Sequence, residues 1–209
     1  TIAGYLPEDF QLRLIDRNVS KESGADWEWA DVVFLSLMLA QWDDYRVCVA
    51  NARFHHKPIA VGGPFTHAVP EVATADADWV CFGEAEDIME EFICDLRADR
   101  QGKQYQGGNS TNMELVKLPR FDLLPNISDY FSMAIQFSRG CPFKCEFCDI
   151  IEIYGRVPRT KTPAQILGEL TALKQLGFRG YVFLVDDNFI GDKRSAKVML
   201  KELAVWSRE

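Results

Sequence analysis

The chain has 209 residues, enough for one large domain or for one ordinary domain and part of another. Hydrophobic residues make up 47% of it and charged residues 26%, as in a globular protein, and no apolar run reaches the about 18 residues of a membrane span. The formal net charge of -8 argues against broad nucleic-acid binding, which depends on Lys and Arg at the phosphates.

Six cysteines occur in a chain that opens with TIAGYLPEDF, which has neither the basic start nor the apolar segment of a secretion signal. We therefore expect a cytoplasmic protein with reduced thiols. In that compartment cysteines bind metals or take part in catalysis more often than they form disulfides.

Short β-rich runs alternate with helical runs up to about residue 98, which predicts a doubly wound α/β domain with a parallel sheet over residues 1–98. The start of the chain resembles the end of a helix whose preceding strand is absent, so we expect a fragment boundary there. The candidate strands are 10–19, 31–39, 57–64 and 79–84, and the helical or turn-rich segments are 41–55, 66–77 and 84–98.

Residues 99–131 are rich in Gly, Asn, Ser and Pro and lack a sustained period, which predicts a linker. Residues 132–209 then begin a second unit. Its candidate strands are 131–137 and 181–187, and its candidate helices are 162–177, between a Thr162 cap and Gly177, and 193–207. Two βα units are the beginning of a barrel that takes about 250 residues, so we expect a truncated partial TIM barrel.

Three cysteines, Cys141, Cys145 and Cys148, lie close together in RGCPFKCEFCDI. A structural zinc site needs four N or S ligands, usually as two separated pairs, and would require a fourth ligand that folds back from elsewhere. An iron-sulfur cubane is normally held by four cysteines, so three would leave one iron open to another ligand.

The cysteine spacing, with Arg139 and Gly140 before it and Phe147 inside it, resembles the cluster loop of the radical S-adenosylmethionine superfamily. The resemblance implies that Cys141, Cys145 and Cys148 hold a [4Fe-4S] cluster, with Phe147 at the cofactor. The open iron would bind the methionine moiety of S-adenosylmethionine. An external donor such as flavodoxin or ferredoxin would supply the electron that releases methionine and a 5'-deoxyadenosyl radical.

The second strand of this unit ends in LVDDNF. These polar residues have two open interpretations, a strand end that caps the next helix or a contact to the cofactor. Similar family members use this strand end for the ammonium or ribose of the cofactor, and Asp187 is our candidate. Arg156, Arg159 and Lys161 follow the cysteines, and we expect a solvated basic loop rather than a substrate or cofactor contact.

The strand ends of the first domain carry DRN, SLM, GGP and GEAE in chain order. This order resembles the cobalamin-binding fold, which has Asp-x-His, Ser-x-Leu and Gly-Gly on successive loops. Asn18 stands where that pattern has the cobalt-coordinating histidine, so we expect cobalamin without a histidine lower ligand; a domain without cobalamin is the alternative. The resemblance implies a cobalamin site formed by Asp16, Asn18, Ser36, Met38, Gly62, Gly63, Gly83 and Glu84.

Over nearly its whole length the chain resembles the cobalamin-dependent radical S-adenosylmethionine enzymes, in the group that includes the hopanoid C-2 methylase. The implied reaction is methylation of an unactivated carbon on a small-molecule or lipid-like substrate, with methylcobalamin as the methyl donor. The alternatives are a non-methylating member that forms rings or rearranges its substrate, and a non-catalytic cobalamin- or cluster-binding module. Alone, the fragment is expected to be inactive, because two βα units cannot enclose a radical.

Overall fold

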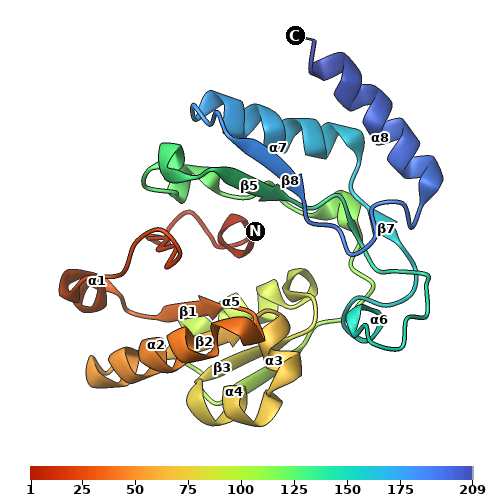
Figure 1. The fold of residues 1–209 in the computed structure, drawn as a ribbon. Helices are drawn as coiled ribbons and strands as arrows, with labels where there is room; N and C mark the ends of the chain where they lie inside the picture. Colours follow the sequence, from red (N-terminus) through yellow and green to blue (C-terminus); the bar gives the residue numbers. More distant parts are fainter. Residues whose placement is uncertain (209) are drawn as a thin grey trace. The chain divides into compact units, whose positions relative to one another are not determined.

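The computed structural model describes residues 1–208, which form two compact units (Figure 1). The first, called the sheet unit, is Ser20–Asn109. The second, called the cysteine unit, combines Thr1–Val19 with the chain from Ser110 onward. The compact units therefore divide the chain differently from the expected domains, because the first 19 residues group with the cysteine-bearing part.

The sheet unit contains four parallel strands in sequential order. They are β1 (Val33–Ser36), β2 (Ile59–Gly62), β3 (Trp79–Phe82) and β4 (Lys103–Gln106). Three of them fall in predicted strands. β4 lies in the predicted linker, because KQYQ buries only Tyr105 and so lacks the apolar pattern that reveals a strand.

Helices cover both faces of this sheet, as a doubly wound fold requires. Val61 and Val80 face the core that contains Tyr45 and Phe65, whereas Phe34, on the other face, contacts Phe92 of α5. The predicted α/β class is therefore confirmed. The helices are α1 (Gly24–Trp29), α2 (Trp42–Phe54), α3 (Pro64–Ala68), α4 (Pro70–Asp76) and α5 (Met89–Arg97).

The strand predicted for residues 10–19 is wrong. Residues 11–16 have no regular structure and a turn follows at 17–19. Their alternating apolar side chains satisfy the pattern of a strand, but a strand also needs a neighbour for its backbone N–H and C=O groups. Within residues 1–208 no ladder includes this segment.

The cysteine unit is built on two βα units, as predicted. β5 (Ser132–Ile135) pairs in parallel with β8 (Tyr181–Leu184). The helices α7 (Pro163–Gln175) and α8 (Lys193–Trp206) cover one face. The core between them contains Met133, Ile135, Phe137, Ile166, Leu173, Phe178, Ala196 and Met199.

The predicted ends of α7 are confirmed. Thr162 and Gln165 form a reciprocal capping box, Pro163 occupies the first turn, and Gly177 follows the helix with φ 86°. The remaining short elements are β6 (Ser138–Arg139), β7 (Arg159–Thr160), α6 (Ile150–Ile153) and the 3-10 turns η1 (Ile2–Gly4), η2 (Leu39–Gln41), η3 (Ala85–Asp87), η4 (Met113–Leu115), η5 (Phe121–Leu123) and η6 (Ile127–Asp129). In the described part of the chain, no helix has the length and apolar character that crossing a membrane requires.

Candidate functional site

The three clustered cysteines lie on a loop whose two ends are joined by a short antiparallel strand pair. β6 pairs antiparallel with β7, with Ser138 opposite Thr160 and Arg139 opposite Arg159. Residues 140–158, which include all three clustered cysteines, form the loop between these strands. We call this segment the cysteine loop. β6 follows soon after β5, so the cysteine loop lies beyond the carboxyl end of β5, where catalytic loops of parallel βα folds lie.

Within the cysteine loop, all three cysteines are free thiols. Cys141 and Cys148 are half-buried, whereas Cys145 is exposed and Phe147 is 93% exposed. The N–H of Cys141 donates to the Gly155 carbonyl at 3.2 Å, and that of Cys148 donates to the Cys145 carbonyl at 3.3 Å. Among residues 1–208, no group of three His, Cys, Asp or Glu side chains is placed to hold a metal ion.

Gly140 makes the close return of this loop possible. Its φ is 87°, and a β-carbon there would lie 2.7 Å from the Val157 carbonyl oxygen and 3.2 Å from those of Gly155 and Tyr154. A larger residue would meet both a strained backbone and a steric clash. The sequence RGC therefore uses its glycine to bring Cys141 against the returning chain.

Three successive side chains at the end of β8 contact β6 and the beginning of the cysteine loop. Asp186 accepts hydrogen bonds from the N–H and the hydroxyl of Ser138. Asp187 accepts one from the N–H of Gly140 at 3.0 Å. The side-chain amide of Asn188 lies 3.4 Å from the Cys141 sulfur.

Burial sets the electrostatics of this strand end. It raises the pKa of Asp186, against hydrogen bonds from Ser138 that favour the carboxylate. It also raises the pKa of Asp187, which the Gly140 hydrogen bond and the charges of Arg139 and Arg159 oppose. Both acids therefore stand in a partly desolvated site beside positive charge.

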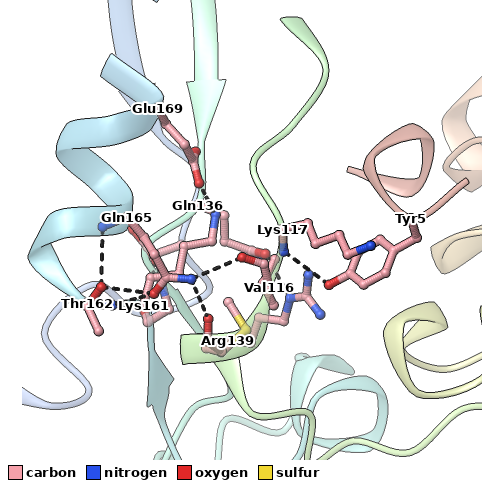
Figure 2. A network of polar contacts seen from close by, with 12 residues as sticks. Tyr5, Val116, Lys117, Gln136, Arg139, Lys161, Thr162, Gln165 and Glu169 are labelled. Carbon is pink, nitrogen blue, oxygen red and sulfur yellow. Dashed lines mark hydrogen bonds and ion pairs between the residues drawn. The ribbon is translucent and has the colours of Figure 1, made fainter. Parts of the chain in front are cut away.

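The predicted solvated basic loop is wrong for Lys161 and Arg159. Lys161 is 5% exposed and forms a 2.5 Å ion pair with the buried Glu169 of α7 (Figure 2). Arg159 donates to the carbonyl oxygens of Thr111 at 2.9 Å and Tyr154 at 2.8 Å. Both side chains therefore stabilise the unit from within, because their partners lie inside it.

Part of the predicted linker is fixed to the cysteine unit. The Gln165 amide donates to the carbonyl oxygens of Met113 at 3.1 Å and Val116 at 3.0 Å. On the same segment, the N–H of Lys117 donates to the Tyr5 hydroxyl at 3.2 Å, as Figure 2 shows. Gln165, a member of the capping box of α7, thus also holds the segment that leads into β5. The composition of the sequence does not reveal this contact.

In the sheet unit, the predicted residues at the ends of β1 and β2 lie together. Ser36 and Gly62 are paired in the ladder. Gly63 has φ 87°, and a β-carbon there would lie 3.2 Å from the Ser36 hydroxyl and 3.1 Å from the Leu37 carbonyl oxygen. Met38 follows with 61% of its surface exposed.

Gly83 and Glu84 lie at the end of β3, against a glycine pair that the sequence analysis missed. A β-carbon on Gly83 would lie 2.3 Å from the Gly107 carbonyl oxygen, and the N–H of buried Glu84 donates to the Gly108 carbonyl at 3.1 Å. The N–H of Gly83 donates to His67 at 3.1 Å. The Gly-Gly pair just after KQYQ is the sequence signal for this close contact, but its composition equally predicts a linker.

A cavity of about 660 Å³ lies beside β3 and β4 in the same unit. Its lining includes Thr66, His67, Phe82, Gln104 and Gln106, and neither Ser36 nor Gly62. The cavity therefore does not include the ends of β1 and β2, where Ser36 and Gly62 of the predicted cobalamin site lie.

Asp16 and Asn18 form a local turn in which the backbone N–H and side-chain amide of Asn18 both donate to the Asp16 carboxylate at 3.0 Å. This turn belongs to the cysteine unit. Burial, above all, and the neighbouring Asp16 raise the pKa of Tyr130 in that unit to about 12. Asp16 and Asn18 are therefore not grouped with Ser36 and Gly62 in one compact unit.

No family model matches the chain. An uncharacterized methyltransferase of Synechocystis sp. is 48% identical over 100% of this chain and 39% of its own length. The hopanoid C-2 methylase of Rhodopseudomonas palustris is 37% identical over 99% of this chain and 40% of its own length. The chain thus spans about two fifths of these relatives.

The radical S-adenosylmethionine methyltransferase TsrM of Kitasatospora setae, solved with tryptophan substrate and an S-adenosylmethionine analogue bound, shares the fold. Its TM-score is 0.63 at 14% identity, over 85% of this chain and 41% of that one.

Full-length similarity to proteins named methyltransferase or methylase, together with the shared fold, supports the B12-binding radical S-adenosylmethionine family that the sequence predicts. Within that family, the similarity to the hopanoid C-2 methylase over 99% of this chain supports the predicted group.

Proposed function

We propose that this chain carries the cofactor-binding part of a cobalamin-dependent radical S-adenosylmethionine enzyme that methylates an unactivated carbon. The observation that carries the proposal is the cysteine loop itself. Three free thiols lie on one loop at the end of β5, and the polar end of β8 contacts the start of that loop. Two relatives that are similar over the full length of this chain are named methyltransferase and methylase, which supports the same reaction class.

The donor set fits a [4Fe-4S] cluster with one open iron in its chemistry, although the structure of residues 1–208 does not bring the three thiols together as a metal site. Thiolates are the ligands that such clusters take, and Cys141, Cys145 and Cys148 are free of disulfides. Cys145 and Phe147 are exposed, so the tip of the loop is accessible to an incoming cluster and to S-adenosylmethionine. When bound, the cluster and S-adenosylmethionine would supply a hydrogen-abstracting radical, and cobalamin would supply the methyl group.

Asp187 would act at the base of this site. Its hydrogen bond to the Gly140 N–H orients the chain that enters the cysteine loop. Its carboxylate stands near Arg139 and Arg159, whose charges favour the ionised form. We assign to Asp187 the orientation of this loop, together with the contact to the ammonium or ribose of S-adenosylmethionine that the sequence predicts.

For cobalamin, the crevice at the ends of β1 and β2 is the proposed site in the sheet unit. Gly62 pairs with Ser36 in the ladder, and Gly63, with φ 87°, turns the chain beside the Ser36 hydroxyl. Two residues without side chains at this strand end would let a flat ligand or its nucleotide tail approach the backbone closely. Asn18 offers no imidazole, so cobalt would lack a histidine lower ligand. Met38, Gly83 and Glu84 belong to the same proposal. The roles of Asp16 and Asn18 stay predictions from the sequence, because both residues belong to the cysteine unit.

A reconstitution experiment tests both halves. The protein is incubated without oxygen with iron, sulfide and hydroxocobalamin, and iron, zinc and cobalt are then quantified. We expect about four irons and one cobalt per chain. A protein with iron but no cobalt would refute the cobalamin site alone, whereas zinc in place of iron would refute the cluster.

The reaction needs a separate measurement on the full-length enzyme. Formation of 5'-deoxyadenosine from S-adenosylmethionine under reducing conditions identifies radical chemistry. Transfer of a labelled methyl group to product then distinguishes methylation from ring formation or rearrangement. Label that stays out of the product while 5'-deoxyadenosine forms would contradict the proposed methylation. The substrate is proposed to be a small molecule or a lipid-like molecule, and a flavodoxin or ferredoxin type of protein to be the electron donor.

A further inference from the structure

The side-chain amide of Asn188 is the only one of the three successive β8-end contacts that reaches a cysteine sulfur. Its nitrogen lies 3.4 Å from the Cys141 sulfur, within the range of an N–H···S hydrogen bond. A thiolate accepts hydrogen bonds and donates none, so the amide must present its NH₂ group to it. Asp186 and Asp187 cannot replace this contact, because ionised carboxylates only accept.

The surrounding backbone keeps Asn188 in this position. On the loop side, Asp187 binds the N–H of Gly140, the residue just before Cys141. On the other side, the N–H of Gly191 donates to the Asn188 carbonyl at 2.9 Å. A β-carbon on Gly191 would lie 3.4 Å from Pro142, so the turn after Asn188 packs on the cysteine loop. The amide therefore reaches Cys141 from a backbone that is fixed at both ends.

Hydrogen bonds to ligand sulfurs influence the reduction potential of iron-sulfur clusters. Reduction adds negative charge, part of which resides on the sulfurs, and a donor stabilises the reduced state more than the oxidised one. A donor fixed at a single sulfur thus favours reduction.

We propose that Asn188 donates a hydrogen bond to the Cys141 ligand sulfur and raises the reduction potential of the cluster; this inference rests on the proposed function. Asn188 is a positioning residue, since it acts through Cys141. The segment that follows β8 then has two roles. Asp187 orients the cysteine loop, and Asn188 adjusts the reduction potential of the cluster.

The test is a redox titration of the anaerobically reconstituted protein, without S-adenosylmethionine, followed by electron paramagnetic resonance. Asn188→Leu removes the donor. We expect the ratio of reduced to oxidised cluster at a fixed potential to fall by up to about tenfold, which is about 59 mV for a one-electron couple. Asn188→Asp has nearly the same size, replaces the donor with a carboxylate, and should lower the ratio at least as much.

Asn126→Leu is the matched control, because Asn126 is an exposed asparagine of the same unit, and it should leave the potential unchanged. Iron is measured in every sample. Wild-type potentials in iron-loaded Asn188→Leu and Asn188→Asp would overturn the inference alone. A wild-type protein that takes up no iron would overturn the proposed function and the inference with it. If Asn188→Leu loses its cluster, the near-isosteric Asn188→Asp decides.

Discussion

The carboxylate of Asp187 accepts a 3.0 Å hydrogen bond from the backbone N–H of Gly140, 47 residues earlier in the chain. This bond joins the end of β8 to the first residue of the cysteine loop. Gly140 has φ 87° and faces three carbonyl oxygens of the returning loop. The position of Cys141 thus depends on a glycine conformation and on a contact between distant strands.

Gly140→Ala should therefore disturb the cysteine loop. The positive φ alone costs about 1–3 kcal/mol for a residue with a β-carbon, and the contact with the Val157 carbonyl adds to it. We expect the free energy of unfolding, measured with urea, to fall by at least about 2 kcal/mol, together with reduced iron uptake. The control is Gly168→Ala in α7, where a β-carbon meets open space and should stabilise the helix by about 1 kcal/mol. Equal effects of both substitutions would contradict this account.

The buried pair of Lys161 and Glu169 predicts strong non-additivity. Replacing Lys161 with Met leaves a buried carboxylate without its partner, which costs about 3–5 kcal/mol. The double variant Lys161→Met, Glu169→Leu should recover most of that loss, because an apolar pair needs no desolvation of charge. Chemical unfolding of the two single variants and the double variant measures the coupling.

An exposed pair in the same unit provides the comparison. Arg120 and Asp122 are about half exposed, so Arg120→Ala should cost at most about 1 kcal/mol. If Lys161→Met is no more destabilising than Arg120→Ala, burial does not account for the strength of the Lys161–Glu169 pair.

Asp95 predicts a loss of stability of the sheet unit in acid. Its carboxylate accepts from Arg100 at 2.5 Å and from the Tyr105 hydroxyl at 2.9 Å, and these bonds hold its pKa below the usual 3.8. A lowered folded-state pKa stabilises the fold above the unfolded-state value, and that stabilisation is lost as the pH falls through the folded-state pKa. The free energy of unfolding is measured by fluorescence in urea at pH values from 6 down to 2. As the pH falls, it should decrease more steeply for wild type than for Asp95→Asn. Parallel pH profiles would exclude Asp95 as a cause of the acid sensitivity.

Single Cys→Ser substitutions test the ligand set. Substitution at position 141, 145 or 148 should remove most of the iron, since an iron-sulfur cluster binds thiolates. Cys94→Ser is the control, because Cys94 is an exposed free thiol on α5 of the sheet unit. The measurement is iron per chain after reconstitution, with the absorption spectrum recorded in parallel. Full iron content in a variant of the loop would remove that cysteine from the proposed set.

Strong periodicity and short-range motifs made part of the structure predictable. Thr162, Pro163 and Gly177 mark the ends of α7 because capping and positive φ depend on neighbouring residues. β4 was missed because Tyr105 is its only buried residue, and the strand at 10–19 was wrongly predicted because it has no partner.

The parallel α/β class, the cysteine spacing and the two βα units can be predicted from the sequence alone, because these follow from local periodicity and from residues a few positions apart. The contacts of Lys161, Arg159 and Asn188, in contrast, depend on the packing of distant segments. Their partners, Glu169, Thr111 and Cys141, lie 8 to 48 residues away. Which of these distant groups meet depends on how strands and helices pack, and the same basic or amide residue would be solvated in another packing.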